Sequence, residues 1–206
     1  MVEINRLPIF TQEVFHFTMP NFEKWKKHIN QIVLVEENDQ IHKHDTSPEE
    51  QCNVMARRTA WNSHQRYPIL NDLCEEIRLY LKEFIKKEGY DIPDIEVKDC
   101  WVNWYKKNQY AQPHVHGHQL SAVLFVDVEK TNSKFFFHAN NYAVFVKKNE
   151  MRSNFSNLVE LNVKDGTVLF FDGSIPHSVS SNITNNNRIT VALNFKLSYI
   201  EKRERY

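Results

Sequence analysis

Cysteine is scarce in this sequence: its 206 residues include three, at Cys52, Cys74 and Cys100. An odd number of widely spaced cysteines argues against a disulfide framework, which pairs them, and against a cysteine-based zinc site, which clusters them. We therefore expect these residues to be small buried thiols.

The sequence also lacks an excess of charge of either sign. Lysine plus arginine number 26, aspartate plus glutamate number 26, and the formal net charge is +0. This balance leaves no electrostatic footprint for a nucleic-acid or acidic-membrane partner. Binding driven by bulk electrostatics is therefore not expected.

Long apolar runs are missing as well. No run approaches the length of a transmembrane helix, and the charged amino terminus, residues 1–15, lacks the features of a secretory signal. Hydrophobic residues reach 41% and are spread along the chain, as in a globular protein. The length suits one domain with one large core, so we predict a single cytoplasmic domain over 1–206 with no membrane contact.

Two amphipathic helices are predicted in the first half of the chain. Apolar residues recur at helical spacing over about 21–36. They do so again over about 68–88, between Pro68 and Gly89, where a glycine permits a left-handed C-cap. The polar stretch 38–51 between the helices is typical of an exposed loop.

From Ile95 onward the pattern changes to short runs rich in β-branched and aromatic residues, separated by Asn, Asp, Gly and Ser. Eight short strands after two helices predict an α+β, mainly β fold: a jelly roll over 95–198, preceded by a helical support region, 1–94, and followed by a tail, 199–206. The predicted strands are about 95–105, 119–128, 133–138, 142–147, 158–163, 167–171, 176–181 and 188–198. The asparagine-rich turn before Arg188 predicts that the last two of them form a hairpin.

The stretch "HVHGH" contains the main candidate for a metal site. On an extended chain, residues two apart face the same side, so His114 and His116 would present two imidazoles to one point. His177, which opens the strand after "DGSIP", is the candidate third ligand. Gly117 makes the backbone pliable, so His118 is an alternative ligand, and Asp172 is an alternative carboxylate.

Arg188 extends this site beyond the metal. If the asparagine-rich turn closes a hairpin, Arg188 lies about four residues, or roughly 13 Å, along the sheet from His177. The gap between the two side chains suits a short dicarboxylate that meets the metal at one end and the guanidinium fork at the other.

Three stretches, "WVNWYKKNQYAQPHVHGHQLSAVLFV", "DGTVLFFDGSIPHSV" and "RITVALNF", resemble the iron(II)- and 2-oxoglutarate-dependent dioxygenases, especially prolyl 4-hydroxylase-like members and small phage and bacterial oxygenases. The resemblance covers most of residues 7–198. It implies a double-stranded β-helix, and it implies iron(II), 2-oxoglutarate and dioxygen as cofactor and cosubstrates. The implied reaction is hydroxylation of a substrate carbon with release of succinate and carbon dioxide.

The resemblance also implies residue roles. His114, His116 and His177 would hold iron, although the family usually has aspartate where this sequence has His116. Arg188 would bind the distal carboxylate of 2-oxoglutarate. Three further residues would support the cosubstrate: Tyr105, which stands nine residues before His114 as in prolyl 4-hydroxylase-like relatives, together with Thr190 and Asn103.

Two alternatives stay open at this point. One is a cupin-like metalloprotein that uses three histidines for chemistry independent of oxoglutarate, since the jelly roll supports many functions. The other is an inactive binding module. The substrate is open among small molecules, sugars and protein side chains, as is the oligomeric state. The tryptophans Trp61, Trp101 and Trp104 are either packing residues or a recognition surface.

Overall fold

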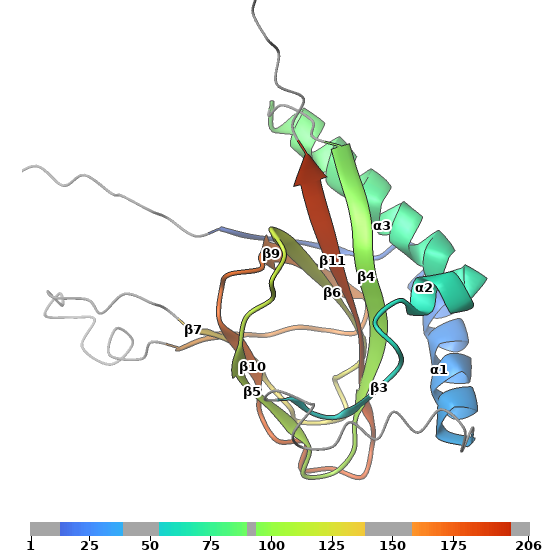
Figure 1. Cartoon of the computed structure of the whole chain (residues 1–206). Helices are drawn as coiled ribbons and strands as arrows, with labels where there is room; N and C mark the ends of the chain where they lie inside the picture. The colour runs from blue at the N-terminus through green and yellow to red at the C-terminus, as the bar shows by residue number, and fades with distance from the viewer. Residues whose placement is uncertain (1–12, 39–53, 90–93, 139–157, 199–206) are drawn as a thin grey trace, which may run out of the picture.

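Figure 1 shows the fold as a computed structural model, which describes residues 13–38, 54–89, 94–138 and 158–198. Two sheets pack face to face, and helices cover the outer side of one of them. In chain order the elements are β1 (Val14–Thr18), α1 (Phe22–Asn38), β2 (Val54–Met55), β3 (Arg57–Arg58), α2 (Ser63–Arg66), α3 (Pro68–Lys87), β4 (Asp94–Tyr105), β5 (Tyr110–His114), β6 (Leu120–Asp127), β7 (Phe135–His138), β8 (Leu158–Leu161), β9 (Thr167–Asp172), β10 (His177–Val179) and β11 (Arg188–Ser198).

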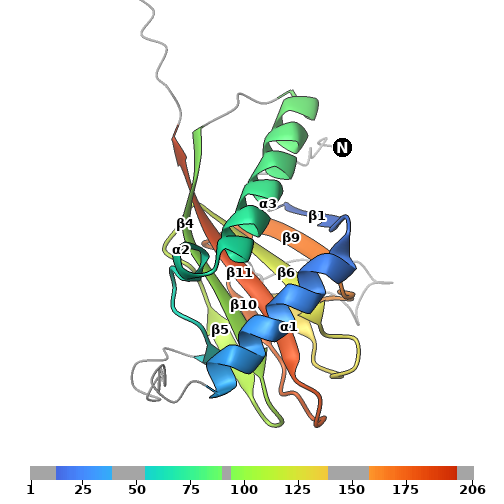
Figure 2. The ribbon, with the colours of Figure 1, turned by 90° about the vertical axis from the view of Figure 1, so that its right-hand side faces the viewer.

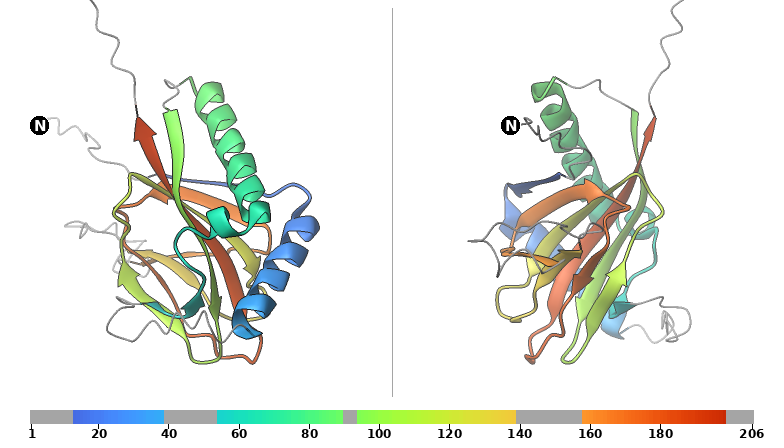
Figure 3. Two further views of the ribbon diagram at one scale, coloured as in Figure 1. Left: turned by 45° about the vertical axis from the view of Figure 1, so that its right-hand side comes forward. Right: turned by 90° about the vertical axis from the view of Figure 1, so that its left-hand side faces the viewer.

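The six-stranded sheet has the order β1-β9-β6-β11-β4-β3, and the five-stranded sheet has the order β2-β5-β10-β7-β8. Every pairing between these strands is antiparallel. The predicted mainly β jelly roll with supporting helices is confirmed. The right panel of Figure 3 views the sandwich from the side opposite the helices.

Helices α1 and α3 lie across the outer face of the six-stranded sheet (Figure 2). The apolar stripe of each faces that sheet and forms a core with it. Helix α3 begins at Pro68, where a missing N–H costs nothing, and ends before Gly89, whose φ of 78° suits glycine. Both predicted helices are confirmed to within two residues.

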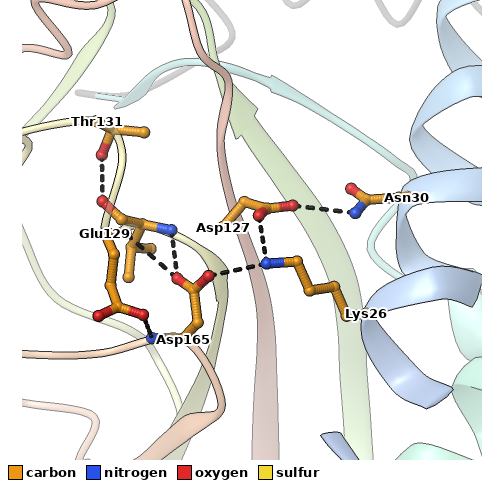
Figure 4. A network of polar contacts seen from close by, with 7 residues as sticks. Lys26, Asn30, Asp127, Glu129, Thr131 and Asp165 are labelled. Carbon is orange, nitrogen blue, oxygen red and sulfur yellow. Dashed lines mark hydrogen bonds and ion pairs between the residues drawn. The ribbon is translucent and has the colours of Figure 1, made fainter. Parts of the chain in front are cut away.

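Polar contacts attach α1 to the sheet at one end (Figure 4). The Lys26 ammonium lies 2.6 Å from Asp127 Oδ1 and 2.8 Å from Asp165 Oδ2. Asn30 Nδ2 donates to Asp127 Oδ2 at 3.0 Å. Although burial alone would lower the pKa of Lys26, the two carboxylates raise it above its usual value, and the ammonium stays charged.

A second core fills the space between the two sheets. Its centre is aromatic, with Phe125, Phe135, Phe137 and Phe171 in edge-to-face or tilted contact. Phe135 and Phe171 also lie beside the ring of His177, at 5.6 and 4.9 Å between centroids. The aromatic core therefore borders the candidate metal site directly.

The predicted hairpin between the last two strands is wrong. Strand β10 belongs to the five-stranded sheet and β11 to the six-stranded sheet, so the segment between them crosses from one sheet to the other. Asn182, fully buried in this crossing, donates from Nδ2 to the carbonyls of Tyr105 and Asn186. The asparagines therefore build an arch between sheets, and His177 and Arg188 stand on opposite sheets. The estimate of 13 Å along one sheet does not apply.

Several elements escaped the sequence analysis, namely β1, β2, β3, β5 and α2. The predicted strand 142–147, the loop 38–51, the tail 199–206 and Cys52 lie outside the described residues. Cys74 and Cys100 are free and buried, as predicted. The division into regions 1–94, 95–198 and 199–206 stays a prediction. No described helix is long and apolar enough to cross a membrane.

Candidate metal centre and its pocket

Three histidines converge between the sheets. His114 ends β5 and faces His177, which begins β10, as a directly paired residue, while His116 lies two residues beyond β5. One ring nitrogen from each lies within 4.8 Å of the others. Ring centroids are 4.3 Å apart for His114 and His177, 4.9 Å for His116 and His177, and 5.6 Å for His114 and His116.

The hydrogen bonds of these rings define which nitrogen is free. Nδ1 of His114 lies 2.8 Å from the carbonyl of Gln112, and Nδ1 of His177 lies 3.0 Å from that of Ile175. A carbonyl only accepts, so each Nδ1 carries the proton and donates it. Each Nε2 is left with its lone pair, which is the form that binds a metal.

Burial keeps all three rings neutral. It lowers the pKa of His177 to about 3 and that of His116 to about 4, with the neighbouring histidines adding to the effect. Burial also lowers the pKa of His114. Neutral imidazoles at neutral pH are ready ligands, because no proton has to leave before a metal binds.

The loop that carries His116 is held by a close backbone contact with Gly173. The N–H of His116 donates to the carbonyl of Gly173 at 2.7 Å. A Cβ at position 173 would lie 2.1 Å from the carbonyl oxygen of His118, so only glycine allows this approach. By contrast, a Cβ at Gly117 would meet nothing within 4 Å.

A cavity of about 720 Å³ extends from the histidines across the inner face of the six-stranded sheet. Strands β4 and β11 form one wall of this cavity. Because alternate residues of a strand share a face, every second cross-strand pair of β4 and β11 faces the cavity. From the deep end to the rim these pairs are Tyr105 with Arg188, Asn103 with Thr190, Trp101 with Ala192, and Asp99 with Asn194.

Among the residues that the structure describes, Arg188 is the largest polar side chain that is fully buried. Nη1 donates to the carbonyl of Ser133 at 3.3 Å, while Nε and Nη2 have no hydrogen-bond partner in the part of the chain that the structure describes. Among the described residues no carboxylate forms an ion pair with Arg188. Burial lowers the pKa of Arg188 to about 10, so the guanidinium is still a cation at neutral pH.

The three other predicted cosubstrate residues line the same cavity. Tyr105 is buried beside Arg188, and burial raises the pKa of its phenol to about 12 although the guanidinium opposes this. Thr190 is buried, and Asn103 accepts a hydrogen bond from Trp101 Nε1 at 3.1 Å. The phenol and both smaller polar groups are therefore neutral and available to a ligand.

The two alternative ligands lie elsewhere. Asp172 is exposed and accepts a hydrogen bond from the N–H of Ser174 at 2.8 Å. His118 Nε2 lies 2.9 Å from Asp99 Oδ2 and does not join the group of three among the described residues. Among the described residues, neither belongs to the group whose ligand atoms lie close together.

Trp61 and Trp101 line the cavity. Trp61, about half exposed, meets Trp101 edge to face at 4.5 Å between ring centroids. The guanidinium of Arg58 lies 3.8 Å from the Trp61 ring. Trp104 is a packing residue on the other face of β4, where its Nε1 donates to Glu37 at 3.1 Å.

Comparison with known families identifies the β core. Residues 99–194 match a family model described as "Putative 2OG-Fe(II) oxygenase", and this segment contains the three histidines and Arg188. Through this core the chain is similar to the 2OG-Fe(II) oxygenases, a class of oxidoreductases. The resemblance seen in the sequence is confirmed. No curated protein matches the chain in sequence.

Solved structures of this class share the fold. HygX from Streptomyces hygroscopicus, with nickel, 2-oxoglutarate and hygromycin B bound, has a TM-score of 0.63 at 12% identity, over 92% of this chain and 85% of its own. A prolyl hydroxylase from Trichoplax adhaerens, in complex with a hypoxia inducible factor peptide fragment, has a TM-score of 0.63 at 10% identity, over 89% and 83%.

A viral collagen prolyl hydroxylase from Paramecium Bursaria Chlorella virus-1, as its 2OG complex, has a TM-score of 0.55 at 12% identity, over 90% of this chain and 96% of its own. At such identities the similarity defines the fold alone. That fold is the double-stranded β-helix predicted from the sequence.

Proposed function

We propose that this chain is an iron(II)- and 2-oxoglutarate-dependent dioxygenase that hydroxylates its substrate. Three neutral, convergent Nε2 lone pairs fit a divalent metal of the iron type. Within the same cavity, a buried guanidinium fits the far end of a dicarboxylate. We assign the metal to His114, His116 and His177, and the cosubstrate carboxylate to Arg188.

The observation that carries the proposal is the unpaired charge of Arg188. A fully buried cation without an anion is unstable, since the Ser133 carbonyl and the Phe125 ring offset only part of its desolvation cost. Nε and Nη2 of Arg188 meet no acceptor among the described residues. A carboxylate in the cavity would supply the missing acceptors and the missing charge, with the fork geometry that arginine prefers.

The protein side chains bind and orient in this scheme. The histidines hold the metal in a fixed position because each Nδ1 is held by a hydrogen bond. Tyr105 and Thr190 flank the carboxylate beside Arg188, and their hydroxyls add neutral hydrogen bonds. When bound, iron(II) and 2-oxoglutarate supply oxidation of a substrate carbon by dioxygen, with release of succinate and carbon dioxide.

The substrate would enter at the end of the cavity nearest His116. The cavity is larger than a five-carbon diacid needs, and half-exposed Trp61 and Val115 mark where it reaches the surface. Trp61 and Trp101 offer a flat apolar surface there. Related structures hold a peptide in one case and hygromycin B in another, and for this chain we propose a peptide or small-molecule substrate.

Substrate-independent turnover tests the proposal. With iron(II), 2-oxoglutarate and dioxygen, the wild-type protein should form succinate and consume oxygen slowly, because this class oxidises the cosubstrate even without a substrate. His177→Ala should form none. If the protein binds metal but forms no succinate, the cupin-like alternative is favoured. If it binds no metal, the binding module is favoured.

A further inference from the structure

A row of three polar residues crosses three strands beneath His116. Ser121 on β6, Asn194 on β11 and Asp99 on β4 are directly paired neighbours in the six-stranded sheet. Ser121 and Asn194 are buried. The side chain of Asp99 is 27% exposed and forms one edge of the cavity.

Hydrogen bonds connect this row to the histidine. Nδ1 of His116 lies 2.8 Å from both Asn194 Oδ1 and Ser121 Oγ, and Ser121 Oγ donates to Asn194 Oδ1 at 2.9 Å. At the other end of the row, Asn194 Nδ2 donates to Asp99 Oδ2 at 3.0 Å. The same carboxylate oxygen lies 2.9 Å from His118 Nε2.

The carboxylate determines how the amide of Asn194 is oriented. A carboxylate only accepts hydrogen bonds, so the NH₂ group of Asn194 has to face Asp99. The carbonyl oxygen of Asn194 then has to face His116. Turning the amide over would place two acceptors 3.0 Å apart and lose both hydrogen bonds.

The orientation of the amide in turn determines the tautomer of His116. A carbonyl oxygen 2.8 Å from Nδ1 requires a proton on that nitrogen. Nε2 then keeps its lone pair for a metal. If the amide were reversed, its NH₂ group would donate to Nδ1, the proton would move to Nε2, and His116 would lose the lone pair that a metal needs.

We propose that Asp99, acting through Asn194, is a positioning residue that holds His116 in its metal-binding tautomer. The inference rests on the proposed role of His116 as a ligand. It also explains how the site works with histidine in place of the family's usual aspartate. A carboxylate is retained, but two hydrogen bonds away from the metal, where it still offsets part of the positive charge.

The tautomer can be measured directly in metal-free protein. Two-bond proton–nitrogen NMR spectra distinguish a histidine protonated at Nδ1 from one protonated at Nε2. Wild-type His116 should be protonated at Nδ1. In Asp99→Asn the new amide can face Asn194 in either orientation, so a second population with protonated Nε2 should appear. Iron(II) or cobalt(II) affinity should fall by about tenfold or more.

An exchange of the two side chains provides the rescue. In Asp99→Asn/Asn194→Asp, a carboxylate at 194 accepts directly from Nδ1 of His116, and an amide at 99 donates to that carboxylate. This double variant keeps the charge and the shape of the row. It should restore a single tautomer and bring the metal affinity back to within about threefold of wild type.

Asp127→Asn is the matched control. Asp127 is also 27% exposed, accepts a hydrogen bond from an asparagine Nδ2 at 3.0 Å, and contacts a basic side chain, Lys26. It does not line the cavity. This variant should leave the His116 tautomer and the metal affinity unchanged.

The outcomes separate this inference from the proposed function. Wild-type His116 protonated at Nε2, or Asp99→Asn with wild-type tautomer and wild-type affinity, would overturn the inference. So would a double variant as impaired as Asp99→Asn. If the tautomers behave as described but no metal binds to wild type, the proposed function falls while the positioning role of Asp99 stands.

Discussion

Arg188 and His177 lie on opposite sheets, and both side chains face the same cavity. Each is buried: Arg188 is a cation without an anion among the described residues, and His177 is a neutral imidazole. A buried cation without an anion reduces stability unless a ligand supplies one. Their convergence in one pocket is the residue-scale basis of the proposed chemistry.

Arg188→Ala should weaken 2-oxoglutarate binding to metal-loaded protein by roughly thirtyfold or more. Loss of a buried charge-assisted contact typically costs about 2–5 kcal/mol, at about 1.4 kcal/mol per tenfold change in affinity. Arg188→Lys should recover part of the loss, since the ammonium keeps the charge but not the fork. Calorimetry with nickel-loaded protein measures the affinity. Equal affinities for wild type and Arg188→Ala would contradict the assignment.

At the scale of elements, the site depends on a contact between two loops. The loop after β5 carries His116, and the loop after β9 carries Gly173, whose backbone the first loop touches. The approach leaves no room for a side chain. The position of His116 is therefore set by the backbone of a loop that contributes no ligand.

Gly173→Ala should displace the loop at 116–118 and lower metal affinity by about tenfold or more. The added Cβ meets a backbone oxygen, which cannot move away alone. Gly117→Ala in the neighbouring loop meets open space and should change affinity by no more than about twofold. Metal titration of the two variants compares them. The prediction is wrong if Gly173→Ala binds metal as Gly117→Ala does.

The helices and strands that are long enough to show a regular pattern of apolar residues were predictable from sequence. Helices α1 and α3 have apolar stripes long enough to show a period of 3.6, and β4, β6 and β11 are long enough to show their β character. Strands β2 and β3 have two residues each, and two residues cannot show a period.

The sequence of a strand and its neighbouring turns does not show which of the two sheets that strand joins. The arch at Asn182 was predicted as a hairpin turn because asparagine suits both. His114 and His116 were predictable as a pair because their spacing is local, whereas His177 lies far from them in the sequence. Asp99 and Asn194 were not, since their pairing depends on the register of two strands 95 residues apart. For Asn194 the available signal was its place inside the apolar run 191–195, whereas Asp99 lies among other polar residues of β4.

At the scale of the whole molecule, the helices, the six-stranded sheet and the five-stranded sheet form three layers with two cores. The outer core holds the helices to one sheet, and the inner core surrounds the site. The candidate ligands therefore lie where the sheets pack against each other. Protonation of these ligands should affect the stability of the entire fold.

Acidification should destabilise the metal-free protein through His177. Its pKa is about 3 when folded and near the usual 6.5 when unfolded, so the unfolded chain binds more protons between these values. Stability is complete above about pH 6.5 and falls as the pH decreases, by about 1.4 kcal/mol per unit for this histidine. Denaturant unfolding between pH 5 and 6.5 measures the slope. His177→Leu should reduce this slope of stability against pH by about 1.4 kcal/mol per unit. Equal slopes for wild type and His177→Leu would contradict the prediction.

The central claim is that one pocket holds iron(II) through three histidines and 2-oxoglutarate through iron and Arg188. Anaerobic titration of the protein with iron(II) and then 2-oxoglutarate tests it most directly, because the chelate gives a visible metal-to-ligand absorption band. Wild-type protein should develop the band and saturate, His177→Ala should show none, and Arg188→Ala should need roughly thirtyfold more 2-oxoglutarate. No band with wild type, or the same band with His177→Ala, would contradict the claim.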